Sequence, residues 1–465
     1  MEEKSFSRQQ GMYYKRGRED LISKLPDSLL SQILSHLPTK DAVRTSVLSH
    51  RWKSVWLLVP NLDLSSSEFP DYTAFASFID KLLAFSREEN SVLYKLKLTL
   101  QKKDESDQSC VTRWIDSAAN PKLNHLDLEC ALANRRFLET IPQSLYTECD
   151  TLVYLRLHRV SLGEIKSVSL LCLKTMRLEH NVYASDASLE SLISSCSLLE
   201  DLSIVRMVPD NVRVVRVRSQ SLTSFHVDYL LGEGDDFFGD LVREGSGVFI
   251  DAPRLKYLKF DDDFSDSKVI ANPVSLEKVN LAFVFGEHDF TDVVELPKRN
   301  MFRGFFKSIS GVKEMKISAY TMEFLDNNRE YETYDPLPQF CNVSILKVAF
   351  YVVNLDMMPT LLESFPNLKS LVLTLDFYDP LEEEADVRHL AVPTCLLSSL
   401  ESVKIRRFNR GPVYMEVARY FLENSHVLKK LVLDFRCLGV EEGFNMLRDL
   451  IALPRLSASC QVLLC

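Results

Sequence analysis

The hexapeptide LVYLRL, residues 152–157, shows the pattern that decides the fold of this 465-residue chain. Leucines occupy its first, fourth and sixth positions, and the spacing recurs thirteen times with Leu or another apolar residue at these places. The thirteen hexapeptides begin at Leu93, Leu123, Leu152, Leu173, Leu199, Leu222, Leu255, Leu276, Val312, Val343, Leu368, Leu400 and Leu428. Their starts lie 21 to 36 residues apart, a period that indicates leucine-rich repeats stacked into a solenoid.

Each hexapeptide should contribute one short strand to a parallel sheet. Because side chains alternate along a strand, its leucines point into the core and the residues between them face outward on the concave side. The chain should return by helix or irregular loop, as in residues 185–202, where Leu189, Leu192 and Ile193 have helical spacing. We therefore expect an α/β fold in which an irregular leucine-rich-repeat solenoid covers residues 91–390.

The stretch LPDSLLSQILSHLPTKDAVRTSVLSHRWKSVW, residues 25–56, has a different texture. Leu29, Ile33 and Leu37 recur at helical spacing and predict a helix that begins near Pro26. A proline at position 38 should end this helix, and Thr39 should cap a second helix whose stripe is Val43 and Val47. Residues 48–56 continue a helical spacing and predict a third helix.

Three short helices are too small to hide all these apolar side chains from water. The segment should therefore dock on another surface. The pattern alone fits a helical cap that seals one end of the solenoid as well as it fits a docking module.

Residues 25–56 closely resemble the F-box, in the form found in the large plant family of F-box proteins with leucine-rich repeats. The matching positions are Leu25, Pro26, Asp27, Leu29, Ile33, Leu34, Leu37, Pro38, Asp41, Val43, Thr45, Leu48, Ser49, Arg51, Trp52 and Trp56. The resemblance implies a short three-helix F-box at residues 20–62 that binds the Skp-type adaptor of a cullin-RING ubiquitin ligase by a mainly apolar contact. The implied adaptor-binding residues are Leu25, Pro26, Leu29, Ile33, Leu34, Leu37, Pro38, Val43, Leu48 and Trp52.

Residues 392–435 resemble the FBD domain that ends many plant F-box proteins. They contain a strand, an Arg-Phe-x-x-Gly turn, a predicted helix at residues 417–424 and a second strand. From the residues alone, this is one more repeat-like unit followed by a C-terminal cap. The expected organisation is a disordered tail at 1–19, the F-box at 20–62, a linker or cap of the array at 63–90, repeats at 91–390 and an FBD domain at 391–465.

Composition excludes several classes of protein. The formal net charge of −10 argues against a general affinity for nucleic acid, which requires a local excess of Lys and Arg. We find neither an apolar run of about eighteen residues nor a signal-peptide core, so we expect no membrane partner and a location in the nucleus, the cytoplasm or both. The ten cysteines stand singly, without metal-ligand or disulfide spacing, and should be reduced and mostly buried.

No sequence motif indicates catalysis. The nucleophile elbow, the Walker loop and the H-E-x-x-H helix are all missing from the sequence. The glycine-containing stretch from Leu230 carries carboxylates that would repel a phosphate, and the acidic runs at residues 261–263 and 382–384 lack the spacing of a calcium loop. We expect no enzyme activity, no cofactor and no metal.

The middle outward position of the hexapeptides is basic in seven of thirteen repeats. Strands stacked about 4.8 Å apart would align these side chains along the concave face. One interpretation is a solvated face balanced by neighbouring acids such as Glu129, Glu179 and Asp261. The other is a groove for an acidic or phosphorylated partner. Its candidate substrate-binding residues are Arg156, Arg177, Lys259 and Lys316.

The resemblance implies the substrate-recognition subunit of an SCF-type ubiquitin ligase, which holds the adaptor and, through it, a cullin, while the repeats hold a protein substrate. Two alternatives stay open. A hormone-like small-molecule receptor on the same scaffold would need clustered Arg or Lys from consecutive repeats, and only Arg156 and Arg177 supply adjacent arginines. The second alternative is an F-box protein that acts outside the ligase.

Overall fold

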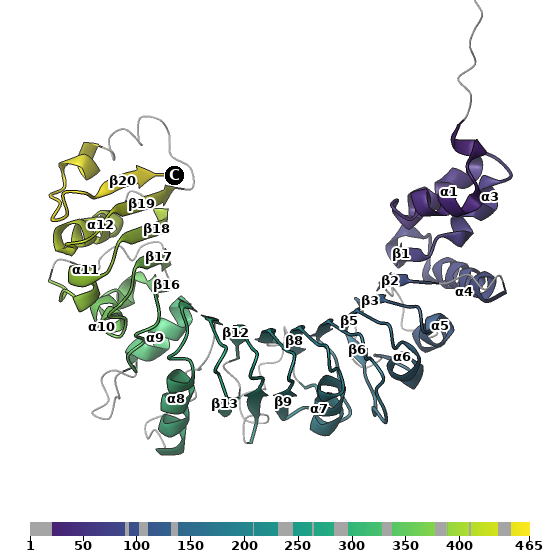
Figure 1. The fold of residues 1–465 in the computed structure, drawn as a ribbon, viewed down its shortest axis with the longest axis horizontal. Helices are drawn as coiled ribbons and strands as arrows, with labels where there is room; N and C mark the ends of the chain where they lie inside the picture. Colours follow the sequence, from purple (N-terminus) through teal and green to yellow (C-terminus); the bar gives the residue numbers. More distant parts are fainter. Residues whose placement is uncertain are drawn as a thin grey trace, which may run out of the picture.

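The protein forms an open arc with strands along its inner side and helices along its outer side (Figure 1). The computed structural model describes residues 21–88, 93–101, 110–131, 138–207, 209–230, 245–262, 265–282, 296–327, 337–376, 387, 389–408, 411–435 and 448–465. The helices of the F-box segment lie at one end of the arc, and the last strands lie at the other.

The inner side is one parallel sheet of fifteen strands within the described residues. In spatial order they are β1 (Asn61–Ser65), β2 (Lys95–Leu100), β3 (His125–Cys130), β5 (Tyr154–His158), β7 (Thr175–Glu179), β8 (Asp201–Met207), β10 (Ser224–Leu230), β12 (Tyr257–Asp261), β14 (Lys278–Leu281), β15 (Glu314–Ile317), β16 (Ile345–Tyr351), β17 (Ser370–Asp376), β18 (Ser402–Phe408), β19 (Lys430–Phe435) and β20 (Gln461–Leu464). All thirteen predicted strands are present, from β2 to β19, so the predicted solenoid is confirmed.

The sheet has one further strand at each end. The stretch VPNLDL before and within β1 also fits the repeat spacing, and β1 pairs in parallel with β2. Helix α4 (Tyr72–Glu88) occupies most of the segment expected to be a linker or a cap of the array. At the other end β20 pairs with β19 but lacks the leucine spacing.

The alternation within each strand follows the predicted phase. Leu152, Leu155 and Leu157 are completely buried, whereas Arg156 faces the concave side. Register aligns equivalent positions, because Leu155 is opposite Met176 and Arg156 is opposite Arg177. The buried positions of all repeats merge into one continuous apolar core.

The outer side is built from unequal elements, as the unequal repeat lengths predict. Its helices are α4, α5 (Val111–Ala118), α6 (Gln143–Glu148), α7 (Asp186–Ser194), α8 (Leu296–Ser308), α9 (Ala319–Asn327), α10 (Met357–Glu363), α11 (Thr394–Ser398) and α12 (Pro412–Asn424), with short 3-10 turns η4 (Ser66–Glu68) and η6 (Val352–Asn354). In the middle of the arc, strands β9 (Val214–Arg218), β11 (Gly247–Asp251) and β13 (Ser267–Ala271) form a second parallel sheet. A two-residue pair, β4 (Glu139–Thr140) and β6 (Val160–Ser161), lies nearer the N-terminus.

The F-box segment contains the three expected helices, α1 (Asp27–Leu34), α2 (Thr39–Arg44) and α3 (Trp52–Val55), with 3-10 turns η1 (Ile22–Lys24), η2 (Thr45–Val47) and η3 (Trp56–Leu58). Thr39 is not the cap of α2. It is the first helical residue after Pro38, and its hydroxyl accepts a hydrogen bond from the Asp63 amide at 2.8 Å. The side chain therefore joins the helix to the first strand of the sheet.

The FBD segment folds as the predicted strand, helix and strand, β18, α12 and β19. Its helix begins at Pro412, earlier than predicted, because proline fits the first turn of a helix. Val417, Phe421 and Leu422 are buried together.

Of the ten cysteines, nine are described and all nine are free thiols, six of them buried. The described helices include none that is long and apolar enough to cross a membrane. Within the described part of the chain, no three His, Cys, Asp or Glu side chains are grouped so that they could hold a metal ion. The loop after Leu230 and the acidic run at residues 382–384 lie outside the described residues, whereas Asp261 belongs to β12 and Asp262 is buried.

Candidate functional site

Helix α1 carries two apolar stripes with different surroundings. Leu30 and Leu34 point into a small core, where they are almost completely buried. Leu29, Ile33 and Leu37 are 43%, 46% and 42% exposed, although they are large apolar residues. The broad apolar face expected from the sequence is therefore an inner stripe that folds the segment and an outer stripe that is open to solvent.

The small core is separate from that of the solenoid. It consists of Leu30, Leu34, Ala42, Trp52, Val55 and Val59, with Leu25 and Trp56 packed against it. Leu34 and Trp52 were predicted as contact residues, but both side chains lie in this interior and are not part of an accessible surface. Leu25 is half-buried, and its carbonyl accepts a hydrogen bond from Arg51, which also bonds Asp27.

The remaining predicted contact residues lie at the surface. Pro26, Pro38 and Leu48 are exposed, and Val43 is half-buried. Val47, expected on the apolar stripe of a longer second helix, is 85% exposed because that helix ends at Arg44 and continues as a 3-10 turn. Val47 is therefore an apolar residue of the surface, although helical spacing puts it on the same stripe as Val43.

Trp56 connects the two cores. Its ring stacks on Phe78 of α4 with centroids 6.0 Å apart and planes 7° from parallel. It packs against both the small core and the solenoid core. Together with the Thr39–Asp63 hydrogen bond and an ion pair of 3.5 Å between Lys40 and Glu68, this contact fixes the segment against the first repeat.

Strand register aligns the middle outward positions along the concave face, but among the four candidates only Arg156 and Arg177 are directly opposite each other. Arg156, however, is 21% exposed in its side chain and is held by three carboxylates. Its guanidinium lies 3.1 Å from Asp127, 3.0 Å from Glu129 and 2.7 Å from Glu179. Hydrogen bonds to Glu179 are the largest cause that raises the pKa of Arg156.

The other three candidates differ in how firmly they are paired. Arg177 lies 3.7 Å from Asp201, and Lys259 lies 3.2 Å from Asp228. Lys316 is exposed and forms no ion pair with the residues that the structure describes. The interpretation of a row balanced by neighbouring acids fits Arg156, Arg177 and Lys259, but not Lys316.

Replacing Arg156 with Met is expected to destabilise the protein by about 2 kcal/mol, because three partly buried carboxylates would lose their common partner. Arg156→Lys should restore only part of this loss, since a single ammonium cannot bond three carboxylates in the geometry of the guanidinium. Urea unfolding measures the difference. Equal stability of wild type and Arg156→Met would show that the cluster contributes nothing.

A second polar network lies on β8, β10 and β12. The Ser203 hydroxyl is 3.2 Å from His226 Nδ1, and His226 Nε2 is 3.4 Å from Asp228 and 2.8 Å from the Lys259 ammonium. Burial opposes ionisation of Asp228, but hydrogen bonds from His226 and Lys259 outweigh it, so its pKa lies below the ordinary value. Serine, histidine and aspartate also occur together in hydrolases, yet Ser203 is almost completely buried, and its hydroxyl is not open to a substrate.

Buried thiols give no better candidate for a nucleophile. Burial raises the pKa of Cys149 to about 11 and the pKa values of Cys196 and Cys395 to about 12. These cysteines stay protonated at neutral pH, whereas a reactive cysteine requires a thiolate.

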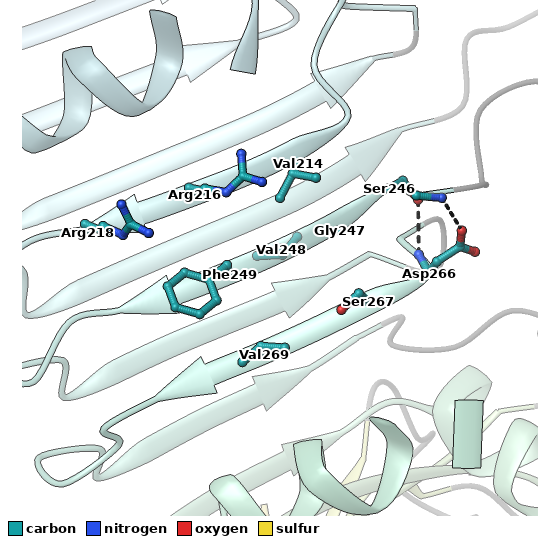
Figure 2. Close-up of a pocket in the computed structure, with 11 residues that line it drawn as sticks. Val214, Arg216, Arg218, Ser246, Gly247, Val248, Phe249, Asp266, Ser267 and Val269 are labelled. Carbon is teal, nitrogen blue, oxygen red and sulfur yellow. Dashed lines mark hydrogen bonds between the residues drawn. The ribbon is translucent and has the colours of Figure 1, made fainter. Parts of the chain in front are cut away.

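A groove of about 410 Å³ lies over the outer sheet of β9, β11 and β13. Figure 2 shows Arg216 and Arg218 on one strand and Phe249 on the next. Arg218 forms an ion pair of 2.7 Å with Glu190 of α7, and Arg216 lies 3.8 Å from Asp186 of the same helix. The arginines are thus largely neutralised, and the groove offers no cluster of free cations for a polyanion.

Three family models match this chain. The F-box domain matches residues 22–63, the FBD domain matches residues 389–433, and the model described as FBD-associated F-box protein At5g56370, LRR repeats, matches residues 111–274. The matches cover the helical segment, a central part of the arc and the C-terminal repeat-like unit.

Similar proteins are known from Arabidopsis thaliana. The chain is 59% identical to FBD-associated F-box protein At5g22730 over 465 residues, which cover 100% of this chain and 98% of the relative. It is 51% identical to putative F-box/FBD/LRR-repeat protein At5g22610, over 96% of this chain and 89% of the relative. The chain belongs to the family of F-box proteins that carry leucine-rich repeats and an FBD domain.

Proposed function

We propose that this F-box protein is the substrate-recognition subunit of an SCF-type ubiquitin ligase in the nucleus or cytoplasm. The observation that carries the proposal is the exposed pair Leu29 and Ile33 on α1, joined by Leu37 just after the helix, while the opposite stripe of α1 builds the small core. Apolar side chains gathered at a surface favour a protein partner. For an F-box this partner is a Skp-like adaptor, and through it a cullin.

The proposed mechanism is proximity. The packing of Trp56 against both cores makes the F-box and the repeats one body, so a substrate held by the arc is carried at a fixed place relative to the adaptor. The receptor would raise the effective concentration of a substrate lysine near the ligase's charged ubiquitin carrier without donating a reacting group.

A hormone-like receptor with a polyanionic cofactor is less well supported. It would require free arginines on consecutive repeats, but Arg156 is committed to Asp127, Glu129 and Glu179. Its neighbour Arg177 faces Asp201. These carboxylates would repel the phosphates of such a cofactor.

The function is tested by affinity purification of the full chain from plant cells with the proteasome blocked. We expect the adaptor, a cullin and at least one ubiquitinated protein that accumulates only under blockade. A variant with Leu29→Asp and Ile33→Asp should lose the adaptor. It should still bind the substrate protein, which would then carry no ubiquitin. Recovery of the adaptor without a cullin would favour a role outside the ligase.

A further inference from the structure

The concave face of the arc is divided into two halves of opposite charge. On the strands from β1 to β12, the outward positions hold five Lys or Arg and seven Asp or Glu, which gives 5 − 7 = −2. On the strands from β14 to β19 they hold six Lys or Arg and three Asp or Glu, and Arg407, at the irregularity of β18, adds a seventh cation that pairs with the outward Asp376, which gives 7 − 3 = +4. The chain as a whole has a net charge of −10, so the positive charge of this second half is opposite in sign to that of the whole chain.

Ion pairs do not consume this excess. Glu314 pairs with Lys278 at 3.1 Å and Lys347 at 2.7 Å. Asp376 pairs with Arg407 at 2.9 Å, and Asp434 pairs with Lys404 at 2.9 Å. Three cations are left with no ion pair to any described residue. They are Lys316 on β15, Arg406 on β18 and Lys430 on β19, and all three are exposed.

Between Lys316 and Arg406 lie uncharged side chains and Lys347, which is already paired with Glu314. Ala349, Val372 and Thr374 face the same side on β16 and β17 and are half-buried. From Lys316 to Arg406 there are three strand spacings across the sheet and two residues along it, about 16 Å at the usual dimensions of a sheet. An extended chain covers that distance in about five residues.

We propose that this positive half of the concave face binds an extended segment of the substrate protein in which Asp or Glu side chains flank an apolar residue. The carboxylates would meet Lys316 and Arg406, and the apolar residue would lie over Val372. The inference rests on the proposed function, because it names the chemistry of the substrate that the repeats hold. Charge complementarity supports it, since Lys316, Arg406 and Lys430 form no ion pair with a carboxylate of the described residues.

The spacing favours carboxylates over a phosphorylated residue. A phosphate is typically held by cations that converge on one point. Lys316 and Arg406 lie three strands apart and would have to extend toward each other to reach one phosphate, whereas Lys404 and Arg407 near Arg406 are already bonded to Asp434 and Asp376. Separated cations instead match charges spread along a segment.

The test measures fluorescence anisotropy of a labelled peptide with the full chain in complex with the adaptor. The probe contains Asp and Glu pairs around a Leu-Val centre. Comparison peptides replace the acids with Asn and Gln, or with Ser and one phosphoserine. We expect the acidic peptide alone to bind, and its affinity to fall as salt is added.

Charge reversal locates the site. Lys316→Glu combined with Arg406→Glu should weaken acidic-peptide binding by at least about tenfold, and the pair of Gln variants should weaken it less. A matched control, Lys95→Glu with Lys122→Glu, makes the same charge change near the N-terminal strands and should bind as wild type. Thermal melting should change little in each variant, because Lys122, Lys316 and Arg406 are exposed, Lys95 is half-buried, and none of the four forms an ion pair with a described residue.

Four results would overturn the proposal: equal binding of the acidic and amide peptides, full binding by the double Glu variant, binding of the phosphoserine peptide alone, or no binding of any peptide. Co-purification of the adaptor is measured separately from peptide binding. Retention of the adaptor with no peptide binding would reject only the acidic-segment site, whereas loss of the adaptor from wild type would reject the ligase function.

Discussion

Replacing Leu29 and Ile33 with Asp is expected to abolish co-purification of the Skp-like adaptor while the protein stays folded. Both side chains are more than two-fifths exposed on the outer stripe of α1, so an aspartate there meets water in the free protein. In the complex the same carboxylates would be buried in an apolar contact without a partner, which costs several kcal/mol. Pull-down with the purified adaptor measures the effect, and thermal melting shows that the fold is intact.

The inner stripe of the same helix supplies the control. Leu30→Ala removes a completely buried side chain from the small core and should lower stability by about 2–5 kcal/mol. It leaves the outer stripe in place, so adaptor binding should persist at low temperature, where the segment is still folded. Full adaptor binding by the double Asp variant would reject the outer stripe as the docking surface.

The repeat array could be predicted from the sequence because its signal is local and is repeated. One strand of L-x-x-L-x-L is ambiguous, but thirteen of them at a period of 21 to 36 residues fit a stacked parallel sheet. The strand phase follows from alternation, which is why Leu155 lies inside and Arg156 lies outside. The first strand, β1, carried the same spacing in residues 59–64 and could have been found.

The charge of the concave face could be predicted only in part. Strand register could be derived, and it placed Arg156 beside Asp127 and Arg177. Whether a basic side chain forms an ion pair depends on its rotamer and on the position of the nearest carboxylate. The sequence alone gives neither of these. Arg406 lies outside the row of middle outward positions, because Lys404 occupies that position on β18 and Arg406 occupies the next outward one.

The division of α1 into two stripes also required the structure. A helix with apolar residues at adjacent positions around half its circumference does not show which of them its neighbours cover. Leu34 and Trp52 are covered by the short helices of their own segment, and Ile33 is not. The family resemblance implies that all three are contact residues. A family motif contains both the residues that form a binding surface and the buried residues that hold this surface in place.

Leu155→Asp is expected to unfold the solenoid around β5. The side chain is completely buried between strands whose equivalent positions are also completely buried, so the carboxylate would find neither water nor a cation. An unpaired buried charge of this kind costs more than about 4 kcal/mol, a large part of the 5–15 kcal/mol that stabilises a typical domain.

Because each repeat is stabilised by its neighbours, the loss should spread along the array. Circular dichroism melting of the adaptor complex should show a large fall in the midpoint, or no folded protein. The matched control is Arg177→Met on the adjacent strand, whose exposed side chain is only loosely paired, and it should change stability by no more than about 0.5 kcal/mol. Equal melting of Leu155→Asp and wild type would mean that β5 does not bury its leucines, and the strand phase of the whole concave face, with the cation surplus of its C-terminal half, would then be wrong.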